Sequence, residues 1–145
     1  MNQGPIIVAC EYPYSTSLVW QALTRPEQLR QWLFEPIDEF KAEVSFTTQF
    51  DVCVEEQSYT HLWEVSEVQP ESRLVYRWRY VGYDGDSSVC WQLRPAGKGS
   101  HLVLTHSGVE SFPQDDPIFA RETGVAGWEY LLNKSLRSFL ERVSK

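Results

Sequence analysis

Hydrophobic and polar residues alternate through the middle of this chain, and at its end the apolar residues recur every three or four positions. Alternation predicts β-strands, whereas the wider spacing predicts an amphipathic helix. We expect strands at 5–12, 43–54, 59–68, 73–82, 87–94 and 101–109, the first of them covered on both faces. Short turns join the later strands, and Asp84-Gly85 is a typical two-residue hairpin turn. The pattern therefore predicts an antiparallel meander.

Helices are predicted on both sides of this meander. Ser15 or Thr16 can cap a short helix, and Pro26 suits the first turn of a second one. The last helix has apolar residues over five turns, at Val125, Trp128, Leu131, Leu132, Leu136, Phe139, Leu140 and Val143. Asp116 is its expected N-cap, but Gly124 and Gly127 disfavour helix, so we expect regular helix from about Val125. This order predicts an α+β fold in one domain, residues 1–145.

The turn lengths also predict which residues face one another across the sheet. They give one continuous row on one face, made of Phe50, Trp63, Trp78, Trp91 and Leu104. Trp128 and Leu132 of the long helix would cover this row. A neighbouring row brings His61, Tyr80 and His106 to the edge of the same apolar face. Such a face either packs into a filled core or lines a cavity, and the residues alone favour the filled core.

Composition and charge exclude several classes of function. The 145 residues contain 13 Lys and Arg against 20 Asp and Glu, a formal net charge of −7 that disfavours nucleic acids and anionic membranes. We expect no membrane span and no secretory signal, because no apolar stretch approaches about 20 residues and the N-terminus lacks a basic region. Three cysteines without metal-like spacing suggest reduced thiols in a cytoplasmic protein.

No catalytic motif is recognisable, and we expect no metal and no cofactor. His106 and Ser107 are neighbours on a strand, so they point to opposite faces and cannot act as a base and nucleophile pair. His61, Tyr80 and His106 could instead orient a ligand in an apolar pocket, or merely bond to their neighbours. The strict register puts Glu67 on the inner face, but we favour a β-bulge or the sheet rim that lets it reach water.

Four motifs in order along the chain resemble a known family. They are Val19-Trp20-Gln21-Ala22-Leu23-Thr24-Arg25-Pro26-Glu27-Gln28-Leu29 followed by Trp32, Trp63-Glu64-Val65-Ser66-Glu67-Val68-Gln69-Pro70 with Leu74 and Trp78, Thr105-His106-Ser107-Gly108, and Gly127-Trp128 with Leu131 and Leu132. Together they resemble the activator of heat-shock-protein-90 ATPase homologue family, within the START-like (SRPBCC) superfamily. The resemblance implies a helix-grip fold, in which a curved antiparallel sheet of about six strands, with two short helices after the first strand, carries a long C-terminal helix across its concave face. It also implies a cavity between sheet and helix.

The leading functional hypothesis is binding of a small hydrophobic ligand, such as a lipid, polyketide or aromatic metabolite, in that cavity. Its expected lining is Phe50, His61, Trp63, Trp78, Tyr80, Trp91, Leu104, His106, Trp128 and Leu132. Two alternatives stay open. One is a cyclase-like or hydrolase-like enzyme that uses His106, although the residues lean against an enzyme. The other is a co-chaperone-like module whose partner is a heat-shock ATPase.

Overall fold

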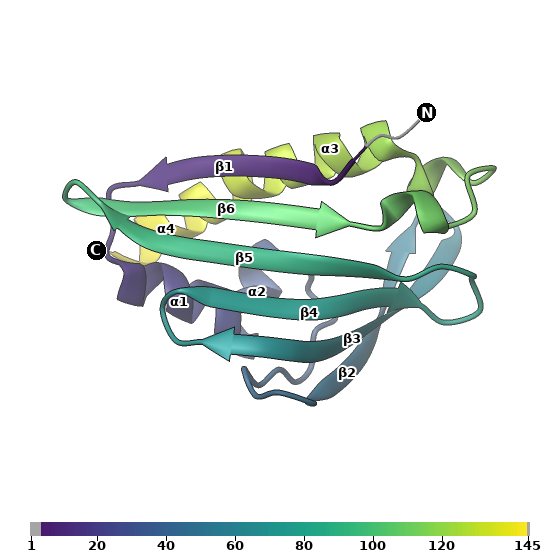
Figure 1. Ribbon diagram of the computed structural model, residues 1–145, viewed down its shortest axis with the longest axis horizontal. Coiled ribbons are helices and arrows are strands. Elements are labelled where there is room, and N and C mark those ends of the chain that lie inside the picture. Colours follow the sequence, from purple (N-terminus) through teal and green to yellow (C-terminus); the bar gives the residue numbers. More distant parts are fainter. Residues whose placement is uncertain (1–3, 145) are drawn as a thin grey trace.

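One antiparallel sheet of six strands forms the centre of the fold in the computed structural model, which describes residues 4–144 (Figure 1). The strands are β1 (Ile6–Tyr12), β2 (Thr47–Val54), β3 (Gln57–Gln69), β4 (Arg73–Tyr80), β5 (Ser87–Ala96) and β6 (Gly99–Ser107). Their spatial order is β1-β6-β5-β4-β3-β2, so each strand from β2 to β6 pairs with the next in sequence. The predicted meander is confirmed, with β1 added beside β6.

All the helices lie against one side of this sheet (Figure 1). They are α1 (Thr16–Thr24), α2 (Pro26–Trp32), the short 3₁₀ turns η1 (Val109–Ser111) and η2 (Pro117–Phe119), and a long C-terminal helix made of α3 (Arg121–Tyr130), the π-helical segment η3 (Leu131–Leu136) and α4 (Arg137–Val143). Ser15 caps α1 by accepting a hydrogen bond from the Leu18 N–H, and Pro26 opens α2, as predicted. The α+β class and the helix-grip fold are confirmed. Among these described helices, none is long and apolar enough to cross a membrane.

The long helix begins at Arg121, four residues earlier than the glycines suggested. Asp116 caps the separate turn η2, where its carboxylate accepts a hydrogen bond from the Ile118 N–H. Gly124 lies where the helix passes over β1, and a Cβ there would come within 2.9 Å of the Ile6 side chain. The helix therefore tolerates a glycine because close approach to β1 requires one.

Two predicted strand registers are wrong. Phe50 pairs with His61 instead of Trp63, because the β2–β3 turn holds only residues 55 and 56. Trp78 pairs with Ser87 instead of Trp91, because the β4–β5 connection spans residues 81–86 and is no two-residue hairpin. In both cases the observed register is displaced from the predicted one by an even number of residues. Since side chains alternate with a period of two, the five row residues keep the face that was predicted for them.

The β3–β4 pairing of Trp63 with Trp78 is confirmed, although the turn between the strands differs from the expected one. The turn spans residues 70–72, and a bulge between Val65 and Glu67 restores the register beyond it. The bulge also turns Glu67 outward, where it pairs with Arg73 at 3.0 Å. The strict register, which puts Glu67 on the inner face, is wrong at this residue, and the favoured prediction of a bulge that lets Glu67 reach water is confirmed.

Two smaller predictions about strands are also wrong. β1 is covered on one face only, and Ile7 on its other face is 61% exposed. β2 begins at Thr47 instead of residue 43, because Ser45 has a left-handed backbone (φ 78°) that interrupts an extended strand.

The main hydrophobic core lies between the concave face of the sheet and the helices. A second, smaller cluster of Tyr59, Phe112 and Phe119 lies where η1 and η2 pack on the ends of β3 and β4. The space between these two packed regions is where the candidate site lies.

Candidate functional site

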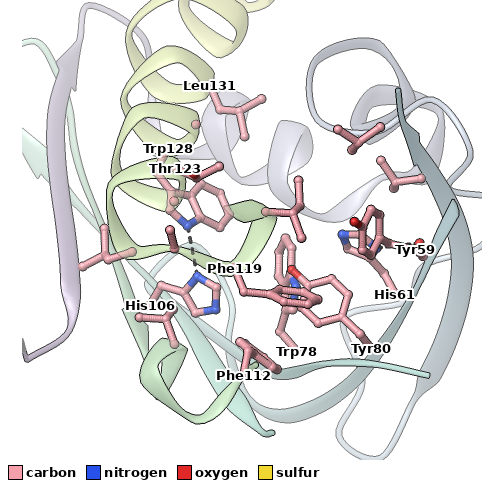
Figure 2. A pocket seen from close by; sticks show the side chains of 18 of the residues that line it. Tyr59, His61, Trp78, Tyr80, His106, Phe112, Phe119, Thr123, Trp128 and Leu131 are labelled. Carbon is pink, nitrogen blue, oxygen red and sulfur yellow. Dashed lines mark hydrogen bonds between the residues drawn. The ribbon is translucent and has the colours of Figure 1, made fainter. Parts of the chain in front are cut away.

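A cavity of about 210 Å³ lies between the sheet and the first turns of the long helix (Figure 2). Its lining comes from three places in the chain. The sheet contributes Ile6, Val52, Val54, Tyr59, His61, Trp78, Tyr80 and His106; the segment after β6 contributes Val109, Phe112, Ile118, Phe119 and Ala120; and the long helix contributes Thr123, Gly124, Gly127, Trp128 and Leu131, with Phe34 closing the side near α2. The lining is overwhelmingly apolar and aromatic.

Half of the residues predicted for the site line this cavity. They are His61, Trp78, Tyr80, His106 and Trp128. The other half, Phe50, Trp63, Trp91, Leu104 and Leu132, are buried in the main core and do not line it. The aromatic row thus divides along its length. In the core, the Trp91 ring meets Trp32 of α2 edge to face and the Trp63 ring stacks on Tyr76, while Trp78 reaches the cavity.

Sequence reasoning missed the wall that follows β6. Phe112 and Phe119 pack against each other and against Tyr80, with ring centroids 4.9 to 5.5 Å apart. They belong to irregular backbone and short 3₁₀ turns, so no periodic pattern could have indicated their direction. Two left-handed glycines hold this segment in place. A Cβ at Gly85 would come within 2.5 Å of the Phe112 ring, and one at Gly108 within 2.6 Å of the Asp86 carbonyl oxygen.

The best-defined polar feature of the cavity is a chain of hydrogen bonds through His106. The Trp128 indole N–H donates to His106 Nδ1 at 3.1 Å (Figure 2), and Nε2 on the other side of the ring lies 2.9 Å from Ser87 Oγ. The Ser87 hydroxyl donates in turn to the Trp78 carbonyl oxygen at 2.7 Å. Since that hydroxyl has a single proton, Nε2 must carry a hydrogen and donate to Ser87. The chain thus specifies a neutral imidazole in the Nε2–H tautomer.

Burial supports the neutral form of His106. The residue is 5% exposed, and burial lowers its pKa to about 4. Protonation of Nδ1 would also break the bond from Trp128. Both nitrogens therefore act within the protein, where they link the long helix to β4, β5 and β6.

Only one of the two ring nitrogens of His61 is hydrogen bonded within the described chain. Its Nδ1 donates to the Tyr59 carbonyl oxygen at 3.1 Å, which leaves Nε2 as an unprotonated acceptor without a partner among residues 4–144. The ring is 5% exposed and lies among aromatic rings, with centroids of Phe34, Phe50, Trp78 and Tyr80 4.7 to 5.3 Å away. Burial lowers its pKa to about 4, so this histidine is also neutral.

Tyr80 and Trp78 supply donors to the same space. Burial raises the pKa of Tyr80 to about 12, so its hydroxyl stays protonated; the nearby Trp78 indole opposes part of that rise. The Trp78 indole N–H is fully buried and lies beside the Tyr80 hydroxyl, where it acts as a hydrogen-bond donor toward the hydroxyl oxygen. Figure 2 shows the Tyr80 and His61 side chains projecting into the cavity from neighbouring strands. The unbonded polar groups thus gather on the β3–β4 side of the cavity.

The cavity opens beside the long helix. Thr123 and Gly127 lie one turn apart on α3 and are exposed, and Val54, which lines the same cavity from β2, is 36% exposed. No atom lies within 4 Å of where a Cβ at Gly127 would stand. A larger side chain at this position therefore has room to stand at the rim of the cavity.

Comparisons with known proteins agree with this architecture. The family model described as activator of Hsp90 ATPase homolog 1-like protein matches residues 13–141. No curated protein sequence matches the chain.

Solved structures share the fold. Protein CV1439 from Chromobacterium violaceum is 22% identical, with 97% of this chain and 99% of that one covered and a TM-score of 0.80. Protein MLL2253 from Mesorhizobium loti is 26% identical, with 95% and 97% covered and a TM-score of 0.74. DynU16, a protein of the dynemicin biosynthetic locus, is 23% identical with a TM-score of 0.76, and the match covers 97% of this chain but 48% of DynU16.

Proposed function

The chain belongs to the activator of Hsp90 ATPase homolog 1-like family, and we propose that it binds a small hydrophobic molecule in the cavity between the sheet and α3. The observation that carries this proposal is the combination of an open, aromatic-lined space with a few unbonded polar groups on one side. Small-ligand sites have this character: mostly apolar walls, with a small number of placed polar groups that fix orientation. The connection of DynU16 with a biosynthetic locus is compatible with such a role.

An enzyme that uses His106 as its acid or base is less well supported. Both nitrogens of that ring are bonded within the protein, to Trp128 and Ser87, and the ring is neutral. A general base must reach the proton that it abstracts, and Nδ1 can do so only after Trp128 has moved. Binding to a heat-shock ATPase, and a cytoplasmic location, stay predictions that rest on the family description and on the cysteines.

The first experiment is a screen of the purified protein by thermal shift and tryptophan fluorescence. Its panel holds fatty acids, sterols, flavonoids and small aromatic molecules. A ligand at 100 times its dissociation constant should stabilise the native state by about 2.7 kcal/mol. Trp78 and Trp128 line the cavity, so a genuine ligand should also change the emission.

Gly127→Leu is the matched variant, because Gly127 lines the cavity and a Cβ added there would meet no neighbouring side chain or strand. We expect Gly127→Leu to remain folded and to lose the ligand-induced shift. Ala126→Leu, one residue along on the exposed side of α3, is the control and should retain it. A ligand that binds Gly127→Leu as well as the native protein would place binding elsewhere and overturn the proposal.

A further inference from the structure

The size of the cavity limits what it can hold. About 210 Å³ is somewhat more than a cavity of about 150 Å³ that accepts benzene, and less than the range of about 300–1,000 Å³ that is usual for drug-sized ligands. One ring or two fused rings fit this volume. A sterol or a long acyl chain would have to protrude through the opening beside Gly127.

The charge of the lining limits the ligand further. The described residues that line the cavity include no Lys, Arg, Asp or Glu. Its two histidines, His61 and His106, are neutral because burial lowers the pKa of each to about 4. A carboxylate or an ammonium group would lose its hydration there without gaining a partner of opposite charge. The cavity therefore favours a neutral molecule.

The free hydrogen-bonding groups specify a complementary polar group on that molecule. His61 Nε2 is an acceptor for which the described residues supply no donor, whereas the Tyr80 hydroxyl has a hydrogen for which they supply no acceptor. A ketone or an ether could satisfy only the Tyr80 hydroxyl. A hydroxyl group satisfies both kinds, because it donates one hydrogen and accepts through its lone pairs. His106 is fully bonded and adds nothing to this demand.

From size, charge and hydrogen bonding together, we infer that the ligand is a neutral phenol of one or two rings, whose hydroxyl lies between His61 Nε2 and the Tyr80 hydroxyl. This inference rests on the proposed function and narrows it to one chemical class. The surrounding rings of Trp78, Phe119 and Trp128 would contact the flat faces and edges of such a ligand.

The test compares three probes of nearly the same shape by isothermal titration: naphthalene, 2-naphthol and 2-naphthoate. The native protein should bind 2-naphthol about tenfold more tightly than naphthalene, because a net hydrogen bond is worth about that factor. The carboxylate should bind more weakly than 2-naphthol. His61→Phe and Tyr80→Phe each keep a ring in place but remove one polar partner. In both variants the affinity for 2-naphthol should therefore come close to the affinity for naphthalene.

The ratio of these two affinities is compared because a change in cavity shape affects both probes alike. His101→Phe makes the same substitution on β6 at a position that does not line the cavity, and should leave the ratio at its native value. Equal affinity of the native protein for naphthalene and 2-naphthol, or tightest binding of 2-naphthoate, would overturn the inference while the binding function stands. The inference would also be overturned, with the binding function intact, if none of the three probes bound but a fatty acid or a sterol did. Failure of every compound in both experiments would overturn the binding function itself.

Discussion

At the scale of single residues, His106 is better explained as a structural link than as a chemical group. It accepts from Trp128 on the helix and donates to Ser87 on β5, and so fixes the indole that forms one wall of the cavity. Sequence reasoning found this histidine and the tryptophan because both lie on apolar faces. It could not find Ser87, since a serine at the start of a strand carries no signal of a buried partner.

His106→Phe tests this role. The substitution leaves the buried Trp128 N–H without an acceptor, whereas the Ser87 hydroxyl still donates to the Trp78 carbonyl oxygen. An unsatisfied buried group costs about 1–3 kcal/mol, so we expect the free energy of unfolding, measured in urea, to fall by about that amount. We also expect the Trp128 indole N–H resonance to shift in an NMR spectrum. Native stability with an unchanged indole resonance would contradict the structural role.

At the scale of elements, the C-terminal helix shows where a periodic pattern stops being informative. Apolar residues spaced by three and four predicted a continuous α-helix, but residues Leu131–Leu136 are π-helical. Within this segment Leu131 lines the cavity, whereas Leu132 and Leu136 are buried in the core. Contacts from distant parts of the chain stabilise this segment, and no local sequence pattern records them.

One of these contacts can be tested directly. The buried Tyr12 hydroxyl donates to the Leu132 carbonyl oxygen at 2.7 Å, and the Ser135 hydroxyl donates to the Trp32 carbonyl oxygen at 2.6 Å. Tyr12→Phe keeps the ring but removes the first bond, so it should lower the free energy of unfolding by about 1 kcal/mol. Amide hydrogen exchange in residues 131–136 should become faster than in the native protein, while exchange in β5 should change less. Unchanged exchange in that segment would show that Tyr12 has no part in holding it.

The strands show a different limit of sequence reasoning. The face of each predicted row residue was correct, because burial enforces the period of two. Two of the partners were wrong, because loop length decides pairing and the 81–86 connection and the 55–56 turn differ from the lengths expected. A pattern of apolar residues therefore predicts the face of the sheet on which a tryptophan lies. It predicts the cross-strand partner of that tryptophan less reliably.

At the scale of the whole molecule, the cavity exists because two packed regions leave a space between them. The main core fills the concave face beneath α1 and α2, and the cluster of Tyr59, Phe112 and Phe119 closes the other end. The first region follows from strand and helix periodicity and was predictable. The second depends on how the irregular segment 108–120 folds back over the sheet, which is why only half of the predicted site residues line the cavity.

The stability of the whole molecule should depend on pH, because both histidines of the cavity are buried in their neutral form. His61 and His106 have pKa values of about 4 in the folded protein, against about 6.5 in an unfolded chain. Between these values the unfolded state binds more protons than the native state, so the free energy of unfolding falls as the pH drops from 6.5 toward 4. Above pH 6.5 these two groups contribute no further slope. The loss should amount to a few kcal/mol for each histidine at most.

Urea unfolding at pH 7.5 and pH 4.5 measures this loss, and a variant separates the histidines from the carboxylates, which titrate in the same range. His61→Phe places a similar ring among Phe34, Phe50 and Tyr80 and removes one of the two depressed groups. The variant should therefore lose less stability than the native protein between the two pH values, while carboxylate contributions stay the same in both. If native protein and variant lose equal stability, His61 is not buried in its neutral form, and the acceptor that the phenol inference requires would be absent.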